Sequence, residues 1–321
     1  MRGKKYIVVL GLCLATVLFI AGCGQGEKQE VQQSSVNSVS VNHFMTEKDI
    51  VQQANESAHA HFFREMVALG PEGVKAAHYS DNCIGCHSAV KMFDDPSAVL
   101  NDFFPGGKYA GQLEGISCRV CHVLDTEEGI ALRKEGWAVC GDCHTAQGRP
   151  KLGSAVHHPQ NEMIRGFGVG EVPDIPSYKC FNMIDFSCYD CHLTNAVKHD
   201  YMVPGVTVTD DGVTQMDYKK FEEVLKQERC IGCHQIVEDT VQSVKTKQEY
   251  ISKKLEELMP LYEEWGEKTG AMDPNDPRVK TFGEATTYLT YVDADASKGA
   301  HNYELAKALL EKAEEKFNEL Q

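Results

Sequence analysis

Apolar residues follow different patterns in successive parts of the chain. Near the N-terminus, Tyr6 to Ile20 is an almost unbroken apolar run. From Gln25 to Asn42 the residues are mostly Gln, Ser, Val and Asn and show no helical period. From there to about residue 235 the apolar residues still lack a sustained period, and Gly and Pro interrupt the chain repeatedly. This pattern predicts a long, loop-rich region.

The C-terminal part has the periodicity of long helices. From Val241 to Trp265, apolar residues recur every three to four positions among Lys and Glu, which predicts an amphipathic helix. The segment Asp273–Pro277 interrupts this pattern, a second helical stretch begins at Lys280, and a third runs from about His301 to Leu320. Residues 241–321 therefore form a predicted helical region that packs on the preceding part of the chain, with a dimer interface as the alternative.

The N-terminal segment has the features of an export signal. A basic stretch, Met1–Lys5, precedes an apolar run of about 15 residues, fewer than the roughly 20 that span a membrane. The run ends in Ile20-Ala21-Gly22-Cys23, which resembles the lipobox of bacterial lipoproteins. The resemblance implies that residues 1–22 are removed as a lipoprotein signal peptide and that Cys23 is lipidated. Residues 23–43 would then be a flexible tether, and an uncleaved membrane anchor is the alternative.

Composition and charge restrict the class of protein. The 321 residues are 42% hydrophobic, and their mean hydropathy of −0.35 excludes a polytopic membrane protein. The net charge of −15 argues against binding to nucleic acid. Loss of the basic signal segment would make the chain more acidic still. We therefore expect an exported protein, lipid-anchored on the extracytoplasmic face of the cell envelope membrane, whose partners carry basic docking patches.

The cysteines carry the strongest chemical signal. Ten of the thirteen fall in five C-x-x-C-H motifs, in which two thiols can bond the vinyl groups of one porphyrin while the histidine ligates its iron. Zinc ribbons, disulfides and thioredoxin-type pairs do not require a histidine at this position. The motifs, numbered first to fifth, are Cys83, Cys86 and His87; Cys118, Cys121 and His122; Cys140, Cys143 and His144; Cys188, Cys191 and His192; and Cys230, Cys233 and His234.

Five covalently bound haem c groups are thus predicted within residues 44–240. The motifs begin 35, 22, 48 and 42 residues apart, which brings neighbouring porphyrins close together. Haem would supply much of the apolar core, since aromatic residues make up only 8% of the chain. A connected series of haems is what electron transfer requires. The predicted fold is mostly α, a multihaem cytochrome c fold with a loop-rich haem-binding region and long C-terminal helices.

Eight histidines outside the motifs are available as distal iron ligands. Five bis-histidine haems would need five of them, and we expect these to come from His301, His199, His78, His158 and His61. His157 competes with His158 for one role, and only one of His59 and His61 is expected to ligate because they face different directions on a helix or strand. His43 lies in the tether and Met183 is a weaker alternative ligand. The unpaired Cys180 is interpreted as a free thiol, with a thiolate ligand or a cross-link as alternatives.

The order of these features resembles the pentahaem cytochrome c nitrite reductases and their hydroxylamine-oxidoreductase-like relatives. The likeness spans about His59 to Leu320 and includes the five attachment motifs. It also includes His158-Pro159 with Glu162 before the fourth motif, and Gly299-Ala300-His301 at the start of the last helix. The late histidine is a distal haem ligand in that family, and the resemblance implies this role for His301.

Several catalytic features of that family are missing. The reductases usually carry C-x-x-C-K at the substrate-binding haem, where this chain has His87. The tyrosine-rich segment after the third motif is replaced by Thr145–Pro150, and the G-x-H stretch before the fourth by Tyr178-Lys179-Cys180. Arg133 is the one candidate for an anion-binding arginine, with a solvated surface charge as the alternative. The chain is also shorter, so the resemblance implies a retained scaffold and a largely absent catalytic pocket.

The sequence therefore favours a membrane-anchored pentahaem cytochrome that transfers electrons between a membrane-linked donor and an extracytoplasmic acceptor. One alternative is a compact nitrite- or hydroxylamine-type reductase with one open haem near Arg133. Another is a structural cytochrome subunit of a larger complex. Expected partners are redox proteins and the membrane, reached through the lipid anchor, with a homodimer as an alternative and no nucleic acid.

Overall fold

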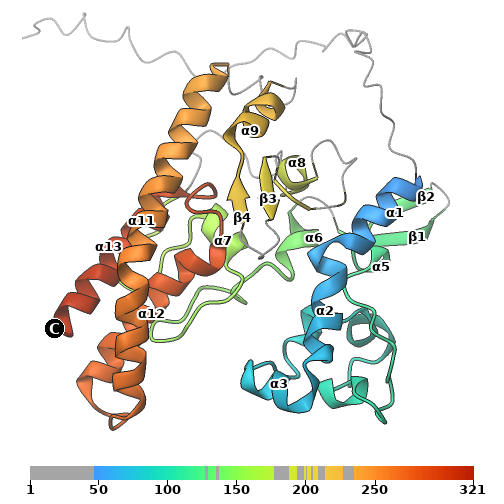
Figure 1. Ribbon diagram of the computed structural model, residues 1–321, viewed down its shortest axis with the longest axis horizontal. Helices are drawn as coiled ribbons and strands as arrows, with labels where there is room; N and C mark the ends of the chain where they lie inside the picture. The colour runs from blue at the N-terminus through green and yellow to red at the C-terminus, as the bar shows by residue number, and fades with distance from the viewer. Residues whose placement is uncertain are drawn as a thin grey trace, which may run out of the picture. The chain divides into compact units, whose positions relative to one another are not determined.

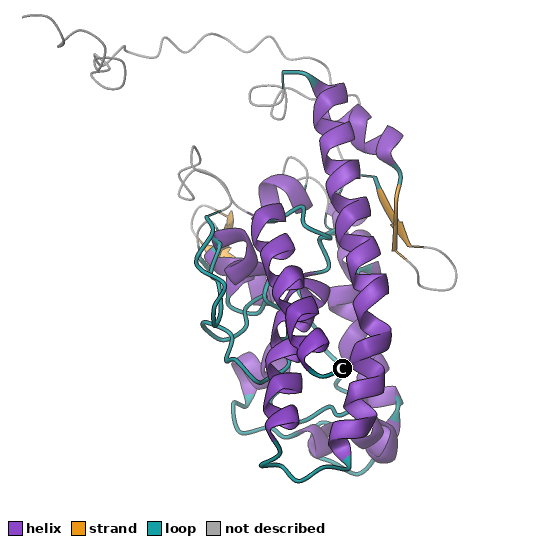
Figure 2. Ribbon diagram, turned by 90° about the vertical axis from the view of Figure 1, so that its left-hand side faces the viewer, coloured by secondary structure: helices purple, strands orange, loops and turns teal. Residues whose placement is uncertain are grey.

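The computed structural model describes residues 47–126, 129–134, 137–176, 188–193, 199, 201–203, 205–208, 214–226 and 235–321 (Figure 1). This part of the chain is mostly helical, as predicted (Figure 2). Predictions for residues 1–22, the tether, Cys23, His43, Cys180, Met183 and the fifth motif, Cys230, Cys233 and His234, concern positions outside the described residues.

Most helices before residue 230 are short. They are α1 (Glu47–Glu56), α2 (Ala58–Ala68), α3 (Gly70–Ala76), α4 (Ile84–His87), a π-helix η1 (Val90–Asp94), a 3-10 helix η2 (Leu100–Phe103), α5 (Cys118–Cys121), α6 (Ala138–Gly141), α7 (Gln160–Arg165), α8 (Cys188–His192) and α9 (Tyr218–Leu225). Two antiparallel hairpins complete this region. In one, β1 (His122–Thr126) pairs with β2 (Gly129–Leu132), and in the other, β3 (Val206–Val208) pairs with β4 (Thr214–Met216).

Three long helices follow: α11 (Val237–Gly270), α12 (Pro277–Asp295) and α13 (Tyr303–Glu319). Their ends explain the small differences from the predicted boundaries. Asp276 caps α12 by accepting a hydrogen bond from the Arg278 amide, and Pro277 occupies the first turn, where no amide donor is needed. Asn302 caps α13 by accepting from Leu305 N.

The three long helices enclose the larger apolar core. On α11, Ile251, Leu258 and Trp265 are buried at intervals of seven residues, which places them on one stripe of the helix. This stripe packs against α12 and α13, which also pack against each other. Tyr291 and Phe317, both fully buried, belong to the same cluster. The long helices are therefore held together by their own side chains.

A second apolar cluster lies in the N-terminal half of the described chain. The rings of Phe63 on α2 and Phe103 on η2 meet edge to face, with centroids 4.9 Å apart. Ile84, inside the first C-x-x-C-H motif, is fully buried in this cluster.

Thr287 anchors a loop to α12 and provides a stability prediction. Its buried Oγ accepts hydrogen bonds from the amides of Gly153 at 2.8 Å and Ser154 at 2.9 Å. Thr287→Val leaves both amides without this acceptor, so we expect the free energy of unfolding to fall by about 1–3 kcal/mol. Chemical denaturation of the haem-loaded protein measures this change. Thr281→Val is the control, because the Thr281 hydroxyl bonds only Pro277 O in its own helix, and equal losses for both variants would contradict the prediction.

Candidate haem-binding site

Each described C-x-x-C-H motif contains one short helical turn. The turn is closed in the first motif by a hydrogen bond from His87 N to Cys83 O at 3.2 Å, and in the third by one from His144 N to Cys140 O at 3.0 Å. Residues three apart lie on the same side of such a turn, so the two thiols of a motif face the same way. Among the described residues, Cys83, Cys86, Cys118, Cys121, Cys140 and Cys143 are free thiols. This geometry suits attachment of one porphyrin per motif.

Cysteines of different motifs meet in space. The Cys86 thiol of the first motif and the Cys143 thiol of the third lie close enough for each to shift the pKa of the other. The Cys140 thiol of the third motif lies similarly close to Cys188 of the fourth, which raises the pKa of Cys140. The third motif is therefore a direct neighbour of both the first and the fourth, although the second motif precedes it in the sequence.

Two motif histidines face a second histidine at the separation that an iron atom requires. The ring centroids of His122 and His199 are 6.3 Å apart, and those of His192 and His301 are 6.2 Å apart. A metal–nitrogen bond to histidine is about 2 Å, and the ring centroid lies roughly 1 Å further, so two imidazoles on one iron have centroids about 6 Å apart. Both pairs match the spacing of bis-histidine ligation.

The second nitrogen of His192 and of His301 is engaged by an oxygen. His301 Nδ1 lies 2.6 Å from Asp295 Oδ1, and His192 Nδ1 lies 3.3 Å from the carbonyl oxygen of Tyr201. Metal-ligating histidines commonly donate their other ring N–H to a carboxylate or a backbone carbonyl. Burial opposes a positive charge on His301, but the Asp295 carboxylate raises the pKa of His301 above its ordinary value.

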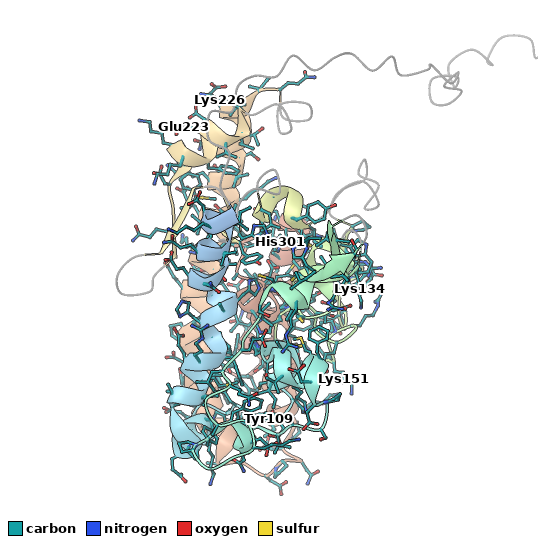
Figure 3. All side chains as sticks on the ribbon, turned by 90° about the vertical axis from the view of Figure 1, so that its right-hand side faces the viewer. Tyr109, Lys134, Lys151, Glu223, Lys226 and His301 are labelled. Carbon is teal, nitrogen blue, oxygen red and sulfur yellow. The ribbon has the colours of Figure 1, made fainter. Side chains whose placement is uncertain are left out.

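The loop between α12 and α13 positions His301 (Figure 3). Asp295 ends α12, and the left-handed conformation of Ala296, with φ 58°, turns the chain away from the helix axis. Ser297 bonds the Asp295 carboxylate through its hydroxyl and accepts a hydrogen bond from His301 N at 3.1 Å. Only 1% of the Asp295 side chain is exposed. The carboxylate therefore interacts both with the loop, through Ser297, and with His301.

The histidines of the first and third motifs also have close histidine neighbours. His87 and His158 have centroids 5.9 Å apart, and His144 lies 5.9 Å from His158 and 5.8 Å from His59. The ring centroid of His157 lies 3.9 Å from that of His158, with the two planes tilted by 50°. Burial, followed by repulsion from neighbouring histidines, lowers the pKa of His59 and of His158 to about 4. Both imidazoles are neutral at pH 7, which is the form that binds metal.

A buried nitrogen supports the fit to haem iron. His122 Nδ1 is buried and has no hydrogen-bond partner among the described residues. Buried polar atoms of this kind call for an explanation, and a place in a haem-binding site supplies one. Together with the paired imidazoles and aligned thiols, the residues present fit covalently attached haem.

The predicted distal ligands differ in their surroundings. His199, His301 and His158 each lie beside a motif histidine. His61 and His78 have no ring contact with a described histidine, and His78 is exposed, so their ligand roles stay predictions. The structure instead brings His59 against His144. Sequence reasoning also missed Asp295 and Tyr201, since neither forms a motif with the histidine that it contacts.

Arg133 lies beside the second motif. Its amide donates to Cys121 O at 2.9 Å and its guanidinium stacks over the ring of Phe93, with 4.6 Å to the centroid. The residue is exposed. No contact of Arg133 with the histidine of a described motif is present, and its role in anion binding stays a prediction.

Asp295 provides a prediction about the fourth motif. Asp295→Asn removes the negative charge that favours the ferric iron through His301. We expect the reduction potential of the haem at the fourth motif to rise by roughly 60 mV. This shift corresponds to a tenfold change in the equilibrium between ferric and ferrous iron. Spectroelectrochemical titration measures this shift. Asp293→Asn, exposed on the same helix, is the control, and a lowered or unchanged potential in Asp295→Asn would contradict the role given to the carboxylate.

No family model and no curated protein matches the chain. Several solved structures are similar to it. The outer cell wall cytochrome OcwA matches with a TM-score of 0.58 and 25% identity over 84% of this chain and 50% of that one. The undecahaem cytochrome from the S-layer of Carboxydothermus ferrireducens matches with a TM-score of 0.55 and 25% identity over 82% and 41%. This chain thus spans half or less of the length of these two proteins.

A third solved structure has a similar fold. Cytochrome c nitrite reductase from Desulfovibrio desulfuricans matches with a TM-score of 0.50 and 17% identity, over 82% of this chain and 69% of that one. None of the described helices is long and apolar enough to span a membrane. The attachment motifs, the paired histidines and the three likenesses agree: the chain has the fold of the multihaem c-type cytochromes.

Proposed function

We propose that this protein is a pentahaem c-type cytochrome that transfers electrons, anchored to the cell envelope membrane through a lipid on Cys23. Bound haem supplies the one-electron chemistry. The chain's own residues attach the porphyrins, ligate the iron from both sides and hold neighbouring sites together. The single observation that carries the proposal is the proximity of the third motif's thiols to those of both the first and the fourth.

Contact between motifs matters because electron tunnelling slows steeply with distance. Thioether bonds at Cys86 and Cys143 would bring the edges of two porphyrins together, and bonds at Cys140 and Cys188 would do the same for the next pair. The result is a continuous row in the order first, third, fourth. Histidine on both sides of the iron keeps the coordination shell closed, which favours a carrier over a catalyst.

The proposed location is extracytoplasmic. OcwA is an outer cell wall cytochrome and the undecahaem protein comes from an S-layer, which supports an equivalent position for this chain. The lipobox-like segment supports lipid anchoring, and a membrane-linked donor would then lie within reach of the tether. The net charge of −15 favours redox partners with basic docking patches, and the C-terminal helices are the candidate surface for a homodimer.

The test is an EPR spectrum of the oxidised protein combined with a CO difference spectrum of the reduced protein. We expect only low-spin haem and no CO binding, since each described motif histidine lies beside a second histidine. A high-spin haem that binds CO would overturn the carrier proposal and favour the compact nitrite- or hydroxylamine-type reductase. Haem content by mass, expected at five per chain, tests the number of attachment sites independently.

A further inference from the structure

Tyr201 lies where three attachment sites meet. Its backbone carbonyl faces His192 Nδ1, at 3.3 Å, in the fourth site. Its ring packs edge-on against His59, with centroids 4.4 Å apart, and His59 in turn contacts His144 of the third site. The ring also lies 6.1 Å from that of His199, which faces His122 of the second site.

Cysteines from two of these sites also surround Tyr201. Cys118 and Cys121 of the second motif and Cys140 of the third lie close enough to interact electrostatically with the phenol group. The phenol group therefore lies near the thiol-bearing turns of two motifs, and the ring itself contacts His59 and His199.

The backbone of Tyr201 adopts a conformation that its side chain disfavours. Its φ of 59° lies in the left-handed region, where the Cβ of a bulky residue crowds the backbone. This conformation directs the carbonyl to His192 while the ring packs on His59. A glycine or an asparagine would take the same backbone conformation more readily, so the tyrosine ring is held at a position where its backbone is disfavoured.

We propose that Tyr201 is a positioning residue that orients the imidazoles of His59, His192 and His199 and thereby joins the second attachment site to the third and fourth. The inference rests on the proposed electron-transfer function. It adds the point at which the second attachment site connects to the series formed by the first, third and fourth sites. Tyr201 is neither oxidised nor reduced in this role. Its ring fixes the imidazole planes of His59 and His199, and its carbonyl fixes that of His192.

The planes of the paired imidazoles give the experimental readout. The rings of His59 and His144 are nearly perpendicular, at 89°, whereas those of His122 and His199 lie at 36° and those of His192 and His301 at 50°. The EPR spectrum of low-spin ferric haem depends on this angle, with perpendicular planes giving the most anisotropic signal. Each site therefore has its own expected signature in the haem-loaded protein.

Three substitutions separate the ring from the carbonyl. Tyr201→Gly keeps the left-handed backbone but removes the ring, so signals of the second and third sites are expected to shift while that of the fourth stays. Tyr201→Val disfavours the backbone conformation as well, and all three signals are expected to shift. Tyr201→Phe keeps both ring and carbonyl, and its spectrum is expected to match that of the native protein.

Kinetics provide the second readout. After flash reduction, we expect electron equilibration between the second site and the others to slow about tenfold in Tyr201→Gly, because misplacement of reacting groups is costly. Gln147→Gly is the matched control: Gln147 is exposed and also left-handed, with φ 58°, so its replacement tests the effect of the glycine alone. It is expected to change neither spectrum nor rate.

Two results would overturn the positioning role. One is a haem-loaded Tyr201→Gly protein with native signals and native rates. The other is a Tyr201→Phe protein that shifts as much as the glycine variant, because the ring and carbonyl are then not the groups that act. Failure of the electron-transfer function is distinguishable, since it appears as CO binding to the native protein and does not involve Tyr201.

Discussion

Replacement of His301 by alanine is expected to convert one haem from low spin to high spin and to create a CO-binding site, while haem content stays unchanged. His301 faces His192 at a centroid distance of 6.2 Å, and Asp295 holds its Nδ1. Alanine offers the iron no ligand, and the surrounding loop contains no other described histidine. EPR of the oxidised protein and CO difference spectra of the reduced protein measure both changes.

Lys298→Ala is the matched control for this substitution. Lys298 belongs to the same loop, is exposed and also has a positive φ, of 51°, so its loss tests the effect of disturbing the loop alone. We expect a native spectrum from this variant. An unchanged low-spin spectrum in His301→Ala would remove His301 from the iron ligands and would leave the Asp295 contact as a structural feature of the loop.

Protein produced without haem attachment is expected to lose structure unequally. The α12 and α13 helices belong to a core formed mainly by side chains of the three long helices, among them the fully buried Tyr291, Leu309 and Phe317. The motif helices α4, α5, α6 and α8 have only four or five residues each. Helices this short are not stable on their own in water, so they depend on the attached porphyrins.

Hydrogen exchange followed by mass spectrometry measures this difference. Without haem, amides of α12 and α13 are expected to stay protected, whereas amides of the motif helices are expected to exchange at rates close to those of an unfolded chain. The haem-loaded protein is the control, in which both groups are protected. Protected motif helices in the haem-free protein would show that the porphyrins are not required for the fold of the attachment region.

Local sequence determined the chemistry of the attachment sites and the long helices. A C-x-x-C-H motif is five consecutive residues, so its capacity to attach haem can be recognised without knowledge of the rest of the fold. The helix predicted from Val241 to Trp265 has its buried stripe at Ile251, Leu258 and Trp265, because a helical period is repeated many times over such a length. The helix extends beyond the predicted range at both ends, from Val237 to Gly270, and no side-chain cap marks its first turn.

Only the tertiary structure decided which residues face one another. His122 lies beside His199, more than seventy positions away, and the third motif lies close to both the first and the fourth, which are farther from it in the sequence than the second. Chain spacing limits how far apart two residues can be, but packing selects which of the allowed contacts form. For the same reason the local sequence does not predict the roles of Asp295 and Tyr201. The turn after α12 brings Asp295 against His301, and the left-handed backbone of Tyr201 brings its carbonyl against His192.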